Sequence, residues 1–181
     1  MKVTAFSGGF GYPSTTTQLL ELIVTELSKR FPTTATTIEL RDVANDLADA
    51  TLLGFASDNL QEAMAQVEQA DILIAGSAVF RGGYAGLFKA FFDLVDPVAM
   101  RGKPVILAAS GQSPRHQLVL DTHLRPLFSY FGSFTLPTSV YASREEWEVG
   151  GRPTAALHER ITRIGHEVEG YFERSPSSTV G

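Results

Sequence analysis

The sequence SGGFGYPSTTTQLLEL, residues 7–22, joins a glycine-rich loop to an apolar helical pattern. Four consecutive hydroxyl side chains, residues 14–17, stand between the two, and no lysine occurs from residue 7 to residue 28. A loop that follows a strand and opens a helix is a good anion site, because free backbone N–H groups and the positive end of the helix dipole both point at it. This stretch therefore predicts a strand–loop–helix unit whose loop can hold an anion without a lysine.

Several interpretations of this loop compete. A nucleoside-triphosphate loop ends in Gly-Lys-Ser/Thr, and the missing lysine excludes it. The segment GFGYPS, residues 9–14, nearly matches the dinucleotide fingerprint G-x-G-x-x-G, and Glu39 stands where a ribose-binding acid could lie, although Ser14 replaces the third glycine. The other interpretations are a cradle for a single phosphate and a plain N-cap from Ser14 or Thr15. One hydroxyl suffices for a cap, so four of them favour the phosphate cradle.

Outward from this stretch, short apolar runs alternate with helical patterns along the chain. The predicted strands are residues 3–8, 34–40, 71–80, 103–111 and 133–142, and the predicted helices are 19–31, 59–70, 86–95, 115–131 and 155–172; residues 42–55 are ambiguous between a short helix and a loop. Strands that alternate with helices predict an α/β fold, with a parallel sheet covered on both faces. Pro137 within the last strand favours an edge position, where a missing N–H is tolerated.

Ligands of such sheets bind beyond the carboxyl ends of the strands, so the loops after residues 7, 77 and 110 are the candidate site. The second loop contains Gly82 and Gly83, which would let the backbone approach a flat ligand, flanked by aromatic side chains. The third loop is rich in small polar residues that could bind the edge of a heterocycle.

Pro126 interrupts the predicted helix at residues 115–131. Proline has no N–H and its ring clashes with the preceding turn, so a kink or a π-type bulge is expected at residues 120–124.

Composition and charge narrow the class of protein. The 181 residues predict one domain at residues 1–172, followed by a disordered tail at residues 173–181. A net charge of −5, with scattered basic residues, argues against a nucleic-acid partner. No apolar run approaches the roughly 20 residues of a membrane span, so no membrane association and a cytoplasmic location are expected. The chain has no cysteine, and its four histidines lack the spacing of metal ligands, so no metal site is expected.

Four motifs together resemble the NAD(P)H-dependent FMN reductase family, whose fold is flavodoxin-like. They are SGGFGYPSTT, VFRGGYAGLFKAFFD, GKPVILAASGQSPRH and LRPLFSYFGSFTLPTSVYA, and the resemblance extends over residues 2–172. It implies a five-stranded parallel sheet of order 2-1-3-4-5 with helices on both faces, an FMN site and the use of NAD(P)H. The most similar branch supplies reduced FMN to monooxygenases, including alkanesulfonate and luciferase-like enzymes.

The resemblance also implies roles for individual residues. The FMN phosphate would be held by Ser7, Ser14, Thr15 and Thr16, and Tyr12 is also expected to bind the cofactor. The ribityl chain and the ring would lie along Val79, Phe80 and Arg81. The pyrimidine edge of the flavin would meet Ser110, Gly111 and Gln112. Arg81 could also neutralise a nicotinamide phosphate or the N1 region of the reduced flavin, or it could remain solvated. No catalytic side chain is expected, because the cofactor carries the hydride chemistry and the protein positions it. A homodimer or homotetramer is expected, with the helix at residues 115–131 packed between subunits.

Two alternative functions remain open. One is a quinone or azo reductase that retains its FMN, and the other is a flavodoxin-type electron carrier with no nicotinamide site. The sequence does not distinguish NADH from NADPH.

Overall fold

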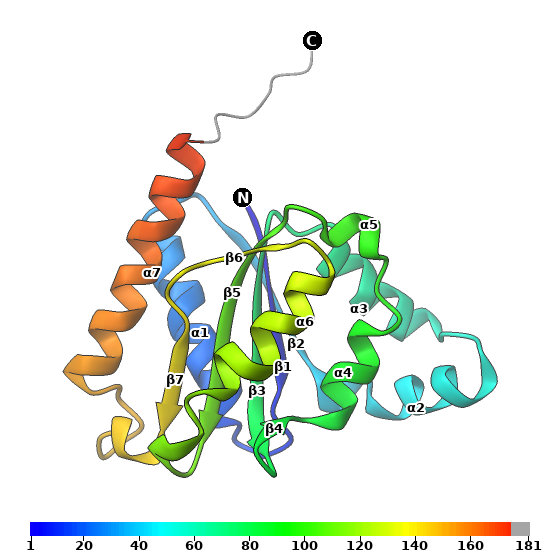
Figure 1. The fold of residues 1–181 in the computed structure, drawn as a ribbon, viewed down its shortest axis with the longest axis horizontal. Helices are drawn as coiled ribbons and strands as arrows, with labels where there is room; N and C mark the ends of the chain where they lie inside the picture. The colour runs from blue at the N-terminus through cyan, green and yellow to red at the C-terminus, as the bar shows by residue number, and fades with distance from the viewer. Residues whose placement is uncertain (175–181) are drawn as a thin grey trace.

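A computed structural model describes residues 1–174, and its centre is a parallel β-sheet (Figure 1). Four strands lie in the order β2-β1-β3-β5: β1 (Lys2–Gly8), β2 (Thr34–Glu39), β3 (Ile72–Phe80) and β5 (Pro104–Gly111). Two shorter strands, β6 (Phe134–Thr135) and β7 (Val140–Ser143), both pair with β5 on its outer side. The parallel part of the sheet thus has the predicted order. The two-residue strand β4 (Gly83–Tyr84) adds a short antiparallel pair at the end of β3.

The last predicted strand is divided in two. Pro137 lies between β6 and β7 and offers no N–H to the ladder, while Leu136 still donates its N–H to Val105 O at 3.0 Å. The prediction that this proline marks the sheet edge is confirmed, because β6 and β7 pair with β5 alone. The extra strands relative to the expected five are this divided strand and β4.

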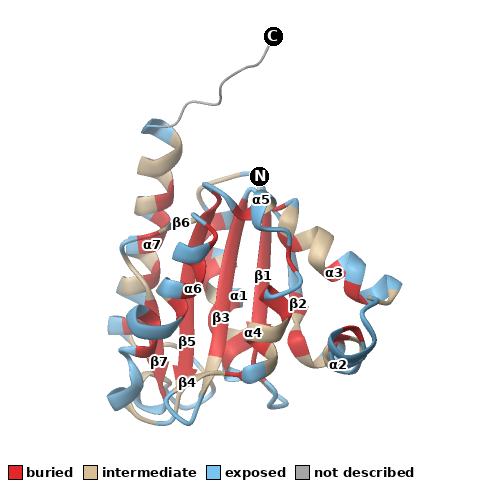
Figure 2. Cartoon of the chain, turned by 45° about the vertical axis from the view of Figure 1, so that its right-hand side comes forward, coloured by how far each residue is buried: buried red, intermediate tan, exposed pale blue. Residues whose placement is uncertain are grey.

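The helices cover both faces of the sheet. Helices α1 (Thr15–Ser28) and α7 (Ala155–Arg174) pack on one face, and α2 (Ala44–Leu53), α3 (Asp58–Glu68), α4 (Gly86–Phe92) and α6 (Arg125–Tyr130) on the other (Figure 1). Successive strand residues point to opposite faces, so Ile72 and Ile74 pack with α1 and α7 while Leu73 packs with the phenylalanine-rich α4. The central strands β1, β3 and β5 are therefore buried on both sides (Figure 2), whereas most of the edge strand β2 is exposed.

Shorter helical segments complete the chain. They are the 3₁₀ turns η1 (Leu40–Asp42), η2 (Pro114–His116) and η4 (Arg144–Glu146), the short helix α5 (Pro97–Met100) and the π-helical turn η3 (Leu120–Leu124). The ambiguous stretch at residues 42–55 contains α2, which ends at Gly54 with φ +78°.

The prediction of one long helix at residues 115–131 is wrong. Pro114 starts a 3₁₀ turn that is capped by the Ser113 hydroxyl, and only residues 125–130 form an α-helix. The predicted bulge at residues 120–124 is confirmed, because η3 is a π-helical turn in which Arg125 N–H donates to Leu120 O. Pro126 follows at once and lacks the N–H that would continue the α-helical pattern.

Helix α7 continues to Arg174, two residues beyond the predicted end of the domain. The rest of the predicted tail, residues 175–181, lies outside the described residues. Among the helices of residues 1–174, none has the length and apolar character needed to cross a lipid bilayer.

Candidate functional site

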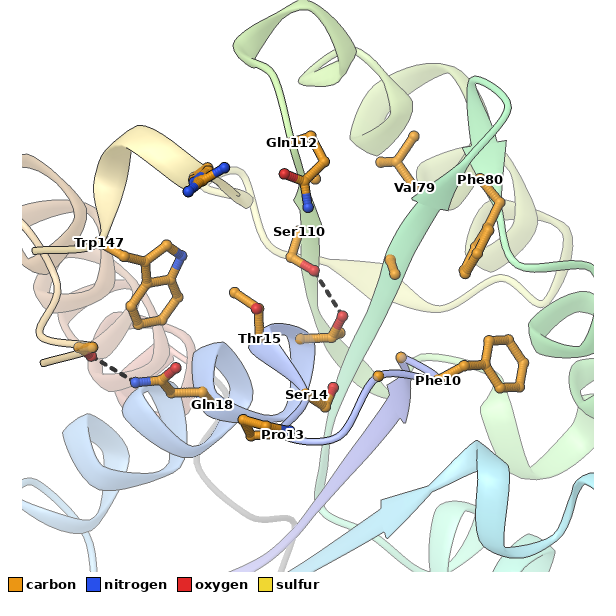
Figure 3. Close-up of a pocket in the computed structure, with 17 residues that line it drawn as sticks. Phe10, Pro13, Ser14, Thr15, Gln18, Val79, Phe80, Ser110, Gln112 and Trp147 are labelled. Atoms are coloured by element: carbon orange, nitrogen blue, oxygen red, sulfur yellow. Dashed lines mark hydrogen bonds between the residues drawn. The ribbon is translucent and has the colours of Figure 1, made fainter. Parts of the chain in front are cut away.

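A cavity of about 760 Å³ opens at the carboxyl ends of β1, β3, β5 and β7 (Figure 3). This is the edge of the sheet where the sequence places a ligand site. The residues that line it are Gly9, Phe10, Gly11, Pro13, Ser14, Thr15, Thr16, Gln18, Ala78, Val79, Phe80, Ser110, Gly111, Gln112, Arg144, Trp147 and Gly151. The three loops predicted from the sequence all contribute, and a fourth segment, residues 144–151, joins them.

The four hydroxyls of the first loop have separate roles. Ser14 is the N-cap of α1 and accepts the Thr17 N–H at 3.1 Å, as the N-cap interpretation requires. Thr17 is buried and its hydroxyl contacts the Ser7 hydroxyl at 2.8 Å, while the Thr16 hydroxyl contacts the Ser110 hydroxyl at 2.7 Å. Thr15 is exposed at the cavity wall. The cap therefore uses one of the four hydroxyls, and Thr16 links the first loop to the third.

The first turn of α1 still offers unused donors. The first bond that closes the helix is Gln18 N–H to Ser14 O at 3.0 Å, and within residues 1–174 the amides of Thr15 and Thr16 have no partner. The turn also contains no acidic residue. Two amide donors and the positive end of the helix dipole therefore face the cavity, which is the arrangement an anion needs.

The second loop is a tight hairpin rather than an open glycine surface. Arg81 has φ +49° and Gly82 has φ +87°, so the pair turns the chain from β3 into β4. Gly82 and Gly83 do not line the cavity, but Val79 and Phe80 do. The Phe80 ring lies 5.8 Å from the Phe10 ring, centroid to centroid, so two aromatic side chains from different loops form one wall (Figure 3).

The third loop presents Ser110, Gly111 and Gln112 to the cavity. A Cβ at Gly111 would overlap the Tyr141 hydroxyl, which itself donates to Ser113 O at 2.7 Å. Burial, together with the nearby Glu146, raises the pKa of Tyr141, so the phenol remains a neutral donor. This contact holds the third loop against β7.

Three of the residues implied by the resemblance lie outside the lining. Ser7 is buried beneath the first loop, Arg81 is exposed at the hairpin tip, and Tyr12 is 89% exposed, with the Arg41 guanidinium 4.9 Å from its ring centroid. Their assignment to the cofactor remains a prediction. Glu39, the acid that the dinucleotide interpretation requires, is paired with Arg41 and does not line the cavity.

The segment at residues 144–151 is a wall of the site that the sequence analysis did not include. Gln18 Nε2 donates to Gly151 O at 2.6 Å, which fastens the segment to the first turns of α1. Trp147 borders the cavity, and its Nε1 is buried with no hydrogen-bond partner within residues 1–174. Its position directly after the last strand was the available signal, because that strand ends at the same edge of the sheet.

The donor set fits FMN. Free amides and hydroxyls at the start of α1 suit a phosphate, Val79 and Phe80 offer an apolar wall to a ring, and Ser110 and Gln112 can bond its polar edge. The orphaned Trp147 Nε1 is one more donor that a ligand could satisfy. In residues 1–174 no three His, Asp or Glu side chains are grouped as metal ligands would be.

Comparison with known proteins points to the same ligand, FMN. Residues 1–148 match the sequence model of a family described as NADPH-dependent FMN reductase. The chain is 44% identical over 147 residues to an FMN reductase (NADPH) of Pseudomonas aeruginosa, covering 81% of this chain and 79% of that protein. It is 39% identical over 174 residues to the NADH-dependent FMN reductase SfnF of Pseudomonas putida, covering 96% and 94%.

Solved structures agree with the fold. The X-ray structure of an oxidoreductase from Corynebacterium diphtheriae superimposes with a TM-score of 0.85 at 35% identity, covering 96% of this chain and 97% of that one. The apo form of the NADH:FMN oxidoreductase EMOB superimposes with a TM-score of 0.80 at 26% identity, covering 99% and 91%. The predicted flavodoxin-like class is confirmed.

Proposed function

Because the chain belongs to the NADPH-dependent FMN reductase family, we propose that its cavity binds FMN with the phosphate at the start of α1. The protein is an NAD(P)H:FMN oxidoreductase, which transfers a hydride from a nicotinamide cofactor to FMN. The observation that carries the binding proposal is the pair of unpartnered amides, Thr15 and Thr16, at a helix N-terminus with no acidic side chain.

The residues around the cavity would bind and orient the two substrates. The first turn of α1 would hold the phosphate, with Ser14 and Thr15 as hydroxyl donors. Val79 and Phe80 would pack beside the flavin ring, and Gln112 would bond its pyrimidine edge. Flavin, when bound, supplies the redox chemistry, so the protein needs proximity and orientation more than an acid or a base.

The function is tested by following NADH and NADPH oxidation while free FMN is titrated. We expect oxidation that depends on added FMN and saturates with it. Oxidation that requires a quinone instead would favour the quinone reductase alternative. A protein that binds FMN and never oxidises either nicotinamide would contradict the reductase function.

Two finer features extend the proposal. The reduced flavin would pass to a flavin-dependent monooxygenase in the cytoplasm, as the resemblance implies.

The chain would form a homodimer or homotetramer with the π-helical turn between subunits. This assembly is supported by the groove beside the π-helical turn, which is lined by Tyr84, Pro126 and the 79% exposed Tyr130. Sedimentation of the purified protein measures the assembly, and a monomer at micromolar concentration would contradict it.

A further inference from the structure

The cavity contains one charged side chain. Of the seventeen described residues that line it, only Arg144 is ionised at neutral pH. The others are apolar, aromatic, hydroxyl or amide residues and glycine, and the first loop has neither lysine nor arginine from residue 7 to residue 28. A dianionic phosphate in this cavity would therefore find a single cation, and that cation comes from the opposite end of the sequence.

Arg144 belongs to the segment of residues 144–151, which lines the cavity together with the start of α1. It begins the segment that Gln18 binds through Gly151 O, and a β-bridge between Trp147 and Pro153 closes the same segment. In Figure 3, Trp147 and Gln18 lie on one side of the cavity and Phe10 and Phe80 on the other, with Ser14 and Thr15 between them. This segment therefore borders the amides of α1, whereas the aromatic wall faces it across the cavity.

Three acids follow Arg144 in the same segment, and none of them forms an ion pair with it; Glu145 is exposed and has no ion-pair partner within residues 1–174. Glu146 is paired with Arg160, and Glu148 lies 4.0 Å from Arg152. Within residues 1–174 the Arg144 guanidinium has no ion-pair or hydrogen-bond partner. The buried Trp147 Nε1 of the same segment also has no acceptor within residues 1–174, and a buried donor left unbonded costs free energy. An anion that reached both side chains would satisfy both.

We propose that Arg144 is the cationic contact of the FMN phosphate, with the Trp147 indole N–H as a neighbouring donor. The inference rests on the proposed function and assigns to that site a contact supplied by the last loop. A guanidinium is suited to this task because its planar donors match phosphate oxygens and form charge-assisted bonds. The hydroxyls and amides of α1 then bind one side of the phosphate, and Arg144 the other.

The test compares FMN with riboflavin, which carries the same ring and ribityl chain without the phosphate. Binding of each flavin to the full-length apoprotein is measured by fluorescence titration at low salt. Arg144→Gln should weaken FMN binding by about tenfold, the scale of one charge-assisted contact, and leave riboflavin binding unchanged. Arg144→Lys should restore part of the loss, and Trp147→Phe should reduce FMN binding by a smaller factor.

Arg152→Gln is the matched control, because Arg152 is an exposed cation of the same loop that does not line the cavity. It should bind both flavins as the wild type does. Thermal unfolding of each variant reports whether the fold is intact.

The outcomes separate the two claims. If Arg144→Gln binds FMN as tightly as the wild type, or loses FMN and riboflavin equally, the assignment of Arg144 is overturned while the reductase function stands. If Arg144→Gln changes only the KM for NADPH, Arg144 serves the nicotinamide cofactor and the assignment is likewise overturned. A wild-type protein that binds neither flavin contradicts the proposed function itself.

Discussion

The two ends of helix α1 differ in how they use charge. The N-terminal turn, residues 14–17, has hydroxyls and no ionised side chain, and two of its amides are unpartnered within the described residues. At the C-terminal end, Glu26 accepts from Arg30 at 2.9 Å and from Lys29 at 3.0 Å, and Arg30 reaches Glu169 of α7 at 2.8 Å. One end leaves its dipole available to a ligand, and the other uses ion pairs to join two helices. The difference agrees with the proposed FMN site, in which the phosphate of the ligand supplies the negative charge at the first turn.

The change with the largest expected effect puts a negative charge at the N-terminal end. Ser14→Asp keeps an N-cap that is as good as serine, so the fold should remain intact. A carboxylate beside the phosphate should weaken FMN binding by about a hundredfold or more, because like charges in contact cost several kcal/mol. Flavin titration measures the loss, and thermal unfolding should show little change.

Ser57→Asp is the matched control for this charge. Ser57 caps α3 in the same way, by accepting the Leu60 N–H at 3.2 Å, but does not line the cavity. It should bind FMN as the wild type does. Similar losses in the two variants would mean that the nearness of the charge to the cavity is not the cause of the effect at Ser14.

A smaller effect is expected from crowding the same end without changing its charge. A Cβ at Gly9 would overlap the Ser14 hydroxyl and lie 2.9 Å from the Thr16 hydroxyl. Gly9→Ala should therefore displace the two hydroxyls and weaken FMN binding by about tenfold, since more than one donor moves. Gly11→Ala serves as the comparison, because its nearest neighbour, Pro13 O, is at an ordinary 3.4 Å; an equal loss in both would contradict the explanation.

The smallest effect is expected at the C-terminal end and should appear in stability alone. Burial by itself would raise the pKa of Glu26, but the hydrogen bonds and charges of Lys29 and Arg30 outweigh it, so the pKa is lowered from its ordinary 4.5. Glu26→Gln should lower the free energy of unfolding at pH 7 by about 1 kcal/mol. FMN binding should not change, and a loss of FMN affinity would break the distinction between the two ends.

The pH dependence of that effect has a definite sign. Because the folded state holds the lower pKa, the contribution of Glu26 is present above pH 4.5 and is lost as the pH falls through the folded value. The stability difference between the wild type and Glu26→Gln should therefore narrow below pH 4.5. Chemical denaturation at several pH values measures it, with Glu21→Gln, an exposed acid of the same helix, as the control.

The strands and the candidate phosphate loop were predictable because local pattern decides them, whereas the order of the strands came from the family resemblance. Buried parallel strands are continuous apolar runs, as in residues 71–80, and proline effects at residues 126 and 137 follow from the missing N–H. The start of the predicted helix at residues 115–131 was wrong, because Pro114–His116 form a 3₁₀ turn that apolar spacing does not distinguish from an α-helix.

The site was predictable in part. Ser14, Thr15 and Thr16 are local to one strand–helix junction, so their position follows from the sequence. Arg144 and Trp147 lie about 130 residues away, and their approach to α1 depends on which strand neighbours β5 and on the contact between Gln18 and Gly151. The lack of acceptors for these two side chains within residues 1–174 depends on how the folded loop places them, which no local pattern encodes.

A crystal structure of the protein with FMN would locate the phosphate. We expect phosphate oxygens within hydrogen-bond distance, about 3 Å, of the Thr15 and Thr16 amides and of the hydroxyls of the first turn. A flavin bound with its phosphate in solvent or at another part of the molecule, with these amides still unpartnered, would contradict this expectation.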